Sequence, residues 1–496
     1  MNNRIISAFL LVIMLLTCFI TGCNTSDSQV ETVTTNDETF TEKQMYDQNG
    51  FLNDSLPENI DLNNDTVSIY VRGDTYNQYY AEQTGDIVDD AIYLKNCKIE
   101  ERLNVKLNIF HNTTDDFWGD RETYINTVRA SVLSNDGTID IAVGLSNIMP
   151  VLVQDGMFYN LLERDTKYLD FDKPWWPADL TNELSVKDRM YLVSGDADLG
   201  VIKYMVGIFF NKNLIEDYKL DDPYELVLNG TWTLDKLEEM ATSIYSDLNG
   251  NSTIDADDQF GFIMDNDNHS TLFVLSSGLS FTEINDQGLP EYNLGTEKIF
   301  DLFDQISNMM KKEGFICNNS MSPGIECGNA FSDGRALFTT GEFKYAETYR
   351  DLNFDYGILP YPKYDESQSN YYSGVRATYS LMGITITANK DNATAVLEAC
   401  ASENYRSVIP VYFEEALKVK YSRDDMSSQM FDIIKNGVKF DLGIILGPLM
   451  GAAITTDVRN ELSFGKGNWA STWASKKASA NQAIKEYFDI ITALEN

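Results

Sequence analysis

Oxygen-bearing side chains recur at alternate positions in one short stretch, DLNGNSTIDADD, which runs from residue 247 to residue 258. Counted from the first residue, positions 1, 3, 5, 7, 9 and 12 are Asp247, Asn249, Asn251, Thr253, Asp255 and Asp258. At this spacing a loop of about twelve residues can wrap carboxylate, amide and carbonyl oxygens around a hard cation. The stretch therefore predicts a structural calcium site, in which Thr253 offers its backbone carbonyl.

Two positions in this stretch depart from the standard EF-hand loop. Position 12 is Asp258 rather than glutamate, so the stretch resembles the calcium loops of dockerin modules. Position 6, where glycine normally allows a sharp turn, is Ser252, and Gly250 comes earlier. The alternative interpretation is an exposed turn, rich in Asn, Gly and Asp, that binds no metal.

Polar residues follow two of the predicted strands and are candidates for binding a ligand. Arg72 and Asp74 follow the first strand and could bracket a hydroxyl group, although solvated charges of a turn are the alternative. Gly144 and Ser146 come at the end of the third strand. Glycine there would allow a ligand to approach the backbone closely.

Aromatic residues make up 12% of the chain, and the tryptophans are the most informative of them. Trp175 and Trp176 lie between two prolines, so they cannot occupy a helix interior. They could present an indole ring to a ligand, or they could pack a loop against a lobe. Trp469 and Trp473 are four residues apart at the start of the last helix, just before residues 474–494, and share one face, which is either core or a ligand platform.

The elements that must position these residues alternate between strand and helix. Strands are predicted at TVSIYV, VKLNIF and TIDIAVG, with helices at residues 89–103 and 124–134 between them. This order indicates a parallel sheet with helical crossovers. Ligands of such sheets bind beyond the carboxyl ends of the strands, where Arg72 and Gly144 fall.

A second set of elements follows and predicts a second α/β lobe. Its members are an apolar strand that runs into a helix at residues 205–214, a helix at 231–245 with Thr233 as N-cap, strands at 335–343, 353–362 and 379–389, and a long final helix at 474–494.

The N-terminus has the organisation of an export signal. Arg4 is followed by an uncharged, mostly apolar run that ends in Ile20-Thr21-Gly22-Cys23, which resembles a bacterial lipobox. The resemblance implies that residues 1–22 are a lipoprotein signal peptide and that Cys23 is lipidated. An uncleaved membrane anchor is the alternative. Residues 23–65 are dominated by polar residues and predict a flexible tether that holds the protein outside the cell membrane of a Gram-positive-type envelope.

Composition excludes several classes of function. The net charge of −38 repels nucleic acid and anionic lipid headgroups. The only histidines are His111 and His269, and no cysteine has metal-ligand spacing, so a histidine-rich zinc site or a Ser/His/Asp triad is not expected. The four cysteines beyond the lipobox are Cys97, Cys317, Cys327 and Cys400. A Cys317–Cys327 bridge and buried free thiols are equally compatible with the sequence.

The order of several strings resembles the extracellular solute-binding proteins of ABC transporters, of the carbohydrate-binding type that includes maltose-binding protein. The strings are the lipobox, GDIVDDAIYLKNCKIEERLNVKL, TIDIAVG, MFYNLLE, DKPWWPADL, RMYLVSGD, GIFFNKNLIEDY, GTWTLDKLEEMA, RALFTTGEF and FDYGILPYPKYDESQSNYYS. The resemblance implies a two-lobed, periplasmic-binding-protein-like fold (type II), in which each lobe has a mostly parallel sheet flanked by helices. A ligand would lie in the cleft between the lobes.

The resemblance also implies lobe boundaries and site residues. Residues 66–200 and 336–395 would form the N-terminal lobe, and residues 201–335 and 396–496 the C-terminal lobe. Asp196 would lie where the chain first crosses between the lobes. The loop after FTTG matches a position where family members contact ligand, which makes Glu342, Phe343 and Tyr345 candidates.

The sequence therefore predicts a lipid-anchored receptor of an ABC importer, and not an enzyme. It would bind a sugar or oligosaccharide by hinged closure of its lobes and would present it to the transmembrane subunits of a permease. We expect a monomer that has no nucleic-acid partner and no cofactor other than the calcium ion. The alternative is a secreted glycoside hydrolase, which needs two carboxyl groups at a fixed separation.

Overall fold

The computed structural model describes residues 46, 47, 49–318, 329–447 and 454–494. The chain divides into two compact units, Met1–Leu52 and Asn53–Asn496. In the first unit, the Asp47 carboxylate accepts hydrogen bonds from the backbone N–H groups of Asn49 and Phe51, each at 2.9 Å. These bonds close a short turn. All the named helices and strands lie in the second unit.

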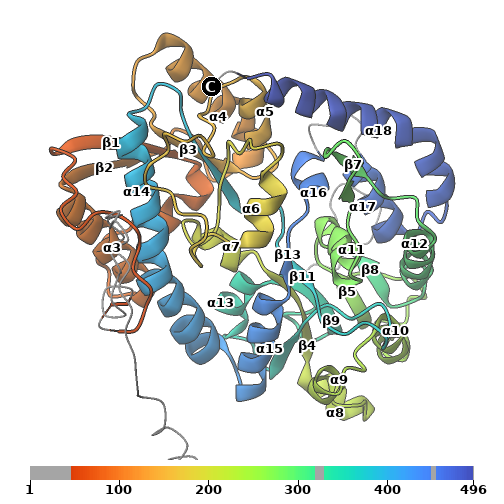
Figure 1. Ribbon diagram of the computed structural model, residues 1–496. Helices are drawn as coiled ribbons and strands as arrows, with labels where there is room; N and C mark the ends of the chain where they lie inside the picture. Colours follow the sequence, from red (N-terminus) through yellow and green to blue (C-terminus); the bar gives the residue numbers. More distant parts are fainter. Residues whose placement is uncertain (1–45, 48, 319–328, 448–453, 495–496) are drawn as a thin grey trace, which may run out of the picture. The chain divides into compact units, whose positions relative to one another are not determined.

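A four-stranded sheet forms the first half of the second unit (Figure 1). Its strands, in spatial order, are β12 (Ser380–Ile384), β3 (Ile141–Leu145), β1 (Asp65–Val71) and β2 (Val105–Phe110). β3, β1 and β2 are parallel, and β12 runs antiparallel to β3. The β-branched residues of β1 favour this extended conformation, and helical crossovers connect the parallel strands.

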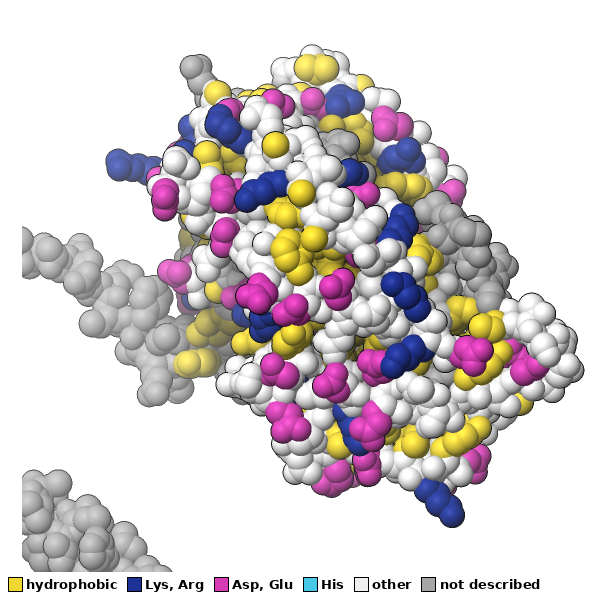
Figure 2. All heavy atoms as spheres, turned by 90° about the vertical axis from the view of Figure 1, so that its right-hand side faces the viewer, with side chains coloured by type: hydrophobic (Ala, Val, Ile, Leu, Met, Phe, Trp, Pro, Cys, Tyr) yellow, Lys and Arg dark blue, Asp and Glu magenta, His cyan; other side chains and the backbone are white. Residues whose placement is uncertain are grey.

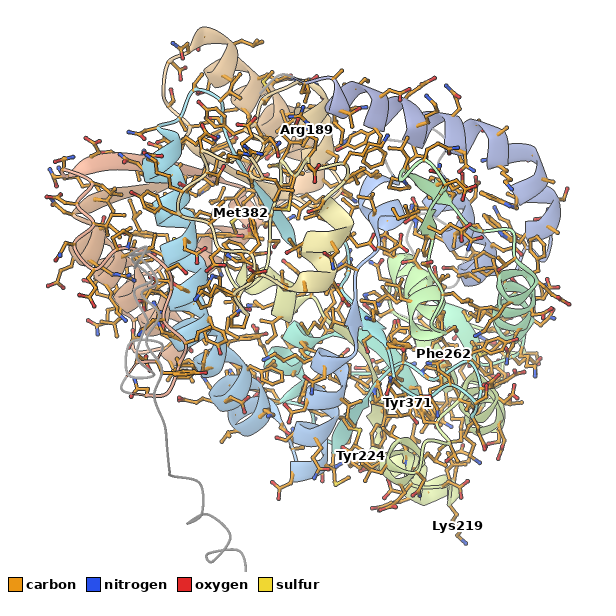
Figure 3. All side chains as sticks on the ribbon, in the orientation of Figure 1. Arg189, Lys219, Tyr224, Phe262, Tyr371 and Met382 are labelled. Carbon is orange, nitrogen blue, oxygen red and sulfur yellow. The ribbon has the colours of Figure 1, made fainter. Side chains whose placement is uncertain are left out.

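A five-stranded sheet forms the other half and is mixed, because one of its five strands, β4, runs opposite to the other four. Its order is β10 (Tyr356–Leu359), β4 (Val206–Asn211), β9 (Ala336–Glu342), β5 (Phe260–Met264) and β8 (Phe315–Cys317). β9, β5 and β8 are parallel, whereas β4 is antiparallel to both of its neighbours. Two small sheets pair β6 (Thr282–Ile284) with β7 (Pro290–Tyr292), and β11 (Ser373–Gly374) with β13 (Val438–Lys439). In Figure 3, Met382 marks the first sheet and Phe262 the second.

Helices cover both sheets. They are α3 (Ile87–Leu103), α4 (Phe117–Ser134), α5 (Met149–Gln154), α6 (Ala178–Leu184), α7 (Leu199–Lys203), α8 (Lys212–Tyr218), α9 (Pro223–Leu228), α10 (Leu234–Thr242), α11 (Leu272–Ser276), α12 (Glu297–Met309), α13 (Ala346–Tyr349), α14 (Lys390–Glu403), α15 (Asp425–Asn436), α16 (Leu442–Leu446), α17 (Ile454–Phe464) and α18 (Trp469–Thr492). Short 3-10 turns are η1 (Gly73–Gln78), η2 (Asp267–Thr271) and η3 (Phe343–Tyr345), and π-helical turns are η4 (Asn404–Val408) and η5 (Val411–Tyr421).

Local sequence signals explain where the helices begin and end. The Asp86 carboxylate caps α3 by accepting from two backbone N–H groups, and Asn104 ends the helix in the left-handed conformation at φ 47°. Thr233 caps α10 as predicted, because its hydroxyl accepts from the N–H of Lys236 at 3.3 Å.

The strand pairing corrects the predicted lobe boundaries. β9 and β10 pair with β4, so residues 336–359 belong to the second sheet and not with residues 66–200. The return to the first sheet comes after β10, through the segment that ends at β12. α14 contacts α3, β1 and β12, so residues 396–403 lie with the first sheet rather than with the C-terminal lobe. Which sheet a strand joins depends on non-local pairing, which local sequence patterns do not report.

The predicted tether is also too long. Leu56 and Leu62 are each 6% exposed, and the backbone N–H of Leu62 donates to the carbonyl of Leu103 at 2.8 Å. Residues 53–65 therefore belong to the folded unit, because a few apolar residues anchor an otherwise polar segment. Residues 1–22, Cys23, the tether up to residue 45 and Cys327 lie outside the described residues, so the signal, the lipidation and the Cys317–Cys327 bridge stay predictions. Within the described parts of the chain, no helix combines the length and apolar character needed to cross a bilayer.

Candidate functional site

The carboxyl ends of strands from both sheets meet around one buried carboxylate, Glu342, the last residue of β9. Its side chain is 0% exposed. One oxygen lies 2.6 Å from a guanidinium nitrogen of Arg376 and 3.5 Å from Nε2 of His269, and the other lies 2.9 Å from Nζ of Lys344. We call these four residues the junction cluster.

The junction cluster holds Glu342 in its ionised form. Burial alone opposes ionisation, but the nearby His269 ring and the positive charges of Arg376 and Lys344 outweigh it and hold the pKa of Glu342 well below its usual range. Nδ1 of His269 lies 2.9 Å from the Thr340 hydroxyl, which fixes the orientation of the ring. A carboxylate that is ionised at neutral pH therefore lies beside Arg376 and Lys344, where the two sheets approach each other.

Arg72 and Asp74 reach this region from the carboxyl end of β1. Arg72 is 1% exposed, lies 3.3 Å from the Asp74 carboxylate and donates to the carbonyl of Thr378 in the segment that precedes β12. Burial raises the pKa of Asp74, while the charges of Arg72 and Lys344 act in the opposite direction. The two predicted residues thus form a pair, and Lys344 links that pair electrostatically to Glu342.

The chain crosses between the sheets first between β3 and β4 and a second time between β10 and β12. A second buried carboxylate, Asp198, lies in the first of these crossings. Its oxygens accept from the Tyr79 hydroxyl at 2.6 Å and from the backbone N–H groups of Gly200 and Ser380 at 3.0 and 2.6 Å. The backbone carbonyl of Tyr204, at the end of α7, accepts from the N–H of Arg376 at 2.9 Å. The first and second crossings are therefore hydrogen-bonded to each other beside the junction cluster.

Tyr345 lies in η3, directly after Glu342. Its hydroxyl donates to the Asp265 carboxylate at 2.8 Å, and Asp265 is the first residue after β5. Burial and the nearby negative charges of Glu342 and Asp265 raise the pKa of Tyr345 far above its usual range. Since β5 and β9 are parallel neighbours, Asp265 and Glu342 emerge at the same edge of the sheet.

Several buried polar atoms beside the cluster lack a hydrogen-bond partner among the described residues. They are Nε of Arg376, Oγ1 of Thr378 and Oγ of Ser380, which lie in one segment, and Oε1 of Gln78, next to Tyr79. Buried polar groups are nearly always hydrogen-bonded, and those left over at one place commonly bind a ligand or water. The set includes a donor on Arg376, an acceptor on Gln78 and hydroxyl groups that can act as either, which suits a solute that carries several hydroxyl groups.

Other predicted ligand residues have packing roles. The Ser146 hydroxyl, which is buried, donates to the carbonyl of Ala377 at 3.0 Å and so ties the end of β3 to the second crossing. A Cβ on Gly144 would lie 2.6 Å from the sulfur of Met149 and 2.8 Å from the Tyr124 ring, so close approach there is to core side chains.

Trp175 and Trp176 are both fully buried and share one acceptor. Their indole N–H groups donate to the two carboxylate oxygens of Glu398 on α14, at 3.1 and 2.9 Å. Their exposed fractions are 0% and 2%. This arrangement favours the packing alternative over a ligand platform, because both polar edges are already bonded within the protein.

We expect Glu398 to make the stability of the protein depend on pH. Desolvation raises its pKa to about 7, against the opposing hydrogen bonds from the two indoles. Because the folded-state pKa lies above the unfolded value, the contribution is fully present below about pH 4.5 and is lost as the pH rises through about 7. Between about pH 5 and pH 8, urea unfolding should show the wild type losing about 3 kcal/mol more stability than Glu398→Gln loses. Equal pH dependence in the two proteins would contradict this assignment.

Two further predicted ligand residues, Phe343 and Trp469, are buried among other aromatic side chains. Phe343 is fully buried against Phe413 and Phe431. Trp469 is 2% exposed, stacks on Trp473 and donates to the carbonyl of Leu294 at 2.9 Å, so that face of α18 is core.

Asp196 does lie in the first crossing, where desolvation raises its pKa to about 7. Its backbone carbonyl accepts from the Asn404 side chain at 2.7 Å. The predicted calcium residues lie together in the connection between α10 and β5.

Sequence reasoning missed three members of the site: His269, Arg376 and Lys344. His269 had one available signal, since it is one of only two histidines in the chain. Arg376 lies between two predicted strands in a segment without a motif, so only the tertiary fold brings it to Glu342.

No protein-family model and no curated protein sequence matches the chain. Solved structures do resemble it. The cyclic α-maltosyl-1,6-maltose binding protein from Arthrobacter globiformis is 12% identical, with 85% of this chain and 99% of that one covered and a TM-score of 0.56. An ABC transporter solute-binding protein from Thermotoga lettingae bound with α-D-tagatose is 15% identical, with 85% and 100% covered and a TM-score of 0.53.

An ABC substrate-binding protein from Listeria monocytogenes, in complex with cycloalternan, is 12% identical, with 87% of this chain and 98% of that one covered and a TM-score of 0.52. All three are binding proteins rather than enzymes. At such identities the likeness establishes the fold and leaves the ligand open. The chain therefore has the two-lobed α/β fold of the ABC transporter solute-binding proteins, as the sequence predicted.

Proposed function

We propose that this protein is the membrane-anchored solute-binding receptor of an ABC importer and that its solute is a sugar or oligosaccharide. The solute would bind at the junction cluster, between the two sheets. Its mechanism is reversible closure of the two halves, with no covalent step. The closed form would then deliver the solute to a membrane permease.

The observation that carries this proposal is the composition of the junction. Arg72 comes from the first sheet, Glu342 from the second, and Arg376 from the crossing between them. Glu342 and His269 are 0% exposed, so a solute reaches them only when the halves separate. Hinged closure is the established way in which a two-domain binding protein opens and covers such a site.

The chemical class of the solute follows from the groups that remain available. Hydroxyl, amide and guanidinium atoms without partners bind hydroxyl-rich molecules in a preformed, desolvated site. Three structural neighbours bind α-D-tagatose, cycloalternan or cyclic α-maltosyl-1,6-maltose. On the face shown in Figure 2, acidic and basic side chains intermingle and apolar ones lie in small groups.

A panel of mono- and oligosaccharides tests the proposal on the purified chain from Cys23 onward. We expect at least one sugar to raise the melting temperature and to bind stoichiometrically in calorimetry, whereas peptides do not. Chromogenic glycosides run in parallel should show no turnover. Turnover without thermal stabilisation would contradict the proposal and favour a glycoside hydrolase.

Membrane anchoring through Cys23 is the second element of the proposal. Its support is the apolar run that ends in Ile20-Thr21-Gly22-Cys23. In cells fed labelled palmitate, the full chain should become labelled and fractionate with membranes, and Cys23→Ala should do neither. Membrane retention of Cys23→Ala would instead indicate an uncleaved anchor.

A further inference from the structure

The connection between α10 and β5 contains the loop from Asp247 to Asp258, which is rich in oxygen-bearing side chains. It follows Ser243, the last residue of the helix cap, and runs directly into β5, the strand whose far end carries Asp265. α10 and β5 contact each other and lie side by side in Figure 1. The loop is thus part of the framework of the second sheet.

The first half of the loop winds around the carboxylate of Asp247. Its two oxygens accept from the backbone N–H groups of Gly250 and Ser252, at 2.7 and 2.8 Å. Ser252, at position 6, has a φ of 61°, the left-handed conformation for which glycine is usual. Ser252 therefore adopts the backbone conformation that glycine normally provides at position 6.

The side chains at positions 3, 5 and 9 converge. The amide nitrogen of Asn249 lies 3.1 and 3.2 Å from the two carboxylate oxygens of Asp255, and that of Asn251 lies 2.6 Å from one of them. Two amide N–H donors thus lie against a carboxylate, in the manner in which a cation would. Rotation of each amide by half a turn would present its oxygen instead of its nitrogen.

Asp258, at position 12, supplies independent support for a ligand. Its side chain is 0% exposed. One oxygen accepts from the backbone N–H of Asp255 and from the Tyr245 hydroxyl, each at 3.1 Å, so the carboxylate faces the loop. The other oxygen, Oδ1, is buried and has no hydrogen-bond partner among the described residues. A buried carboxylate oxygen without a partner is costly, and a bound cation would supply the missing partner.

Arg335, next to β9, fixes the end of the loop. Its guanidinium group donates to the backbone carbonyls of Ala256 and Asp258, the latter at 2.9 Å. The position of Asp258 is therefore set by the sheet and does not depend on the exposed part of the loop. Within the described ranges, no three His, Cys, Asp or Glu side chains alone are grouped so that they could hold a metal. The amide and carbonyl oxygens of this loop must complete the ligand set, as they do for calcium.

We propose that the loop from Asp247 to Asp258 binds one calcium ion. Asp247, Asn249 and Asn251 provide side-chain oxygens, Thr253 its carbonyl, Asp255 a ligand through water, and Asp258 the unpartnered Oδ1. The ion would fix the start of β5 relative to α10. This inference does not depend on the nature of the solute, since the loop and the junction cluster lie at opposite ends of β5.

Calorimetry of the chelator-treated chain with calcium chloride tests the proposal, with magnesium chloride as the comparison. We expect one calcium ion per chain with a Kd of about 1 mM or tighter, weaker binding of magnesium, and a rise in melting temperature. Asp247→Asn combined with Asp255→Asn should abolish the heat. Asp257→Asn, which makes the same kind of substitution at one exposed neighbour, should retain it.

A gain-of-binding variant keeps the test independent of folding. Ser252→Gly relieves a left-handed serine and should bind calcium severalfold more tightly than the wild type. Absence of any calcium heat or thermal shift in the wild type at about 5 mM would overturn the proposal. Equal calcium binding by the wild type and a folded Asp247→Asn, Asp255→Asn variant would also overturn it, because the ion would then lie elsewhere.

Discussion

Glu342→Gln is expected to lower the free energy of unfolding by about 3 kcal/mol at neutral pH and to weaken solute binding by about 10- to 100-fold. The substitution removes the only negative charge that Arg376, Lys344 and His269 share in the junction cluster. The partly exposed side chains of Arg376 and Lys344 can regain some hydration, which keeps the expected loss near the lower end for a buried pair.

The pH dependence of this effect distinguishes it from a general packing defect. The folded-state pKa of Glu342 is depressed, so its contribution is present above the unfolded value of about 4.5 and is lost as the pH falls toward the folded-state pKa. Urea titrations should therefore show a smaller difference between the wild type and Glu342→Gln at about pH 3 than at about pH 7. Glu366→Gln, at an exposed position, is the matched control and should match the wild type. A difference that stays constant over this pH range would contradict the assignment.

Asp54→Asn is expected to destabilise the protein by about 3–5 kcal/mol, although it lies in a segment that looks disordered by composition. The Asp54 side chain is 2% exposed, and its two oxygens each accept from Arg102 at 2.6 Å. Arg406 also donates to it at 3.1 Å. The charges of these two arginines hold the pKa of Asp54 well below its usual range despite burial.

Thermal and urea unfolding of Asp54→Asn, beside Asp61→Asn, would measure this contribution. Asp61 is exposed, and it accepts hydrogen bonds from the backbone N–H of Asn63 and the side chain of Asn104 at the surface. Its substitution should therefore cost less than about 1 kcal/mol. A wild-type unfolding curve for Asp54→Asn would show that residues 53–65 are not part of the cooperative unit.

Local elements of the fold were predictable because their signals are local. The β-branched run of β1, the periodic apolar positions of α3 and the Thr233 cap each specify their element without help from distant residues. The division of strands between the sheets was not predictable in the same way. β9 joins the second sheet through pairing with β4, more than a hundred residues earlier in the chain, and no local property of RALFTTGEF reports that partner.

The site was predictable only in part, for the same reason. Arg72 and Asp74 could be found because they follow a strand, and strand ends meet at a ligand site in sheets of this kind. Glu342 could be found only through the resemblance to the solute-binding proteins. Arg376 and His269 reach the same place from segments without a motif. Trp175 and Trp176 were uncertain in sequence because an indole pair serves a core as well as a cleft, and Glu398 on a distant helix decides between them.

The central claim, closure of two halves on a solute at the junction, is tested most directly by a distance measurement between the halves. Leu133 on α4 and Leu228 on α9 are 76% and 49% exposed, and spin labels at cysteines placed there, in a Cys97→Ser background, report the separation of the two sheets. With the sugar that stabilises the protein most, we expect a longer distance to give way to a shorter one, and we expect a weaker response in Glu342→Gln. If the distance between the two labels is the same with and without a sugar that calorimetry shows to be bound, the account is contradicted.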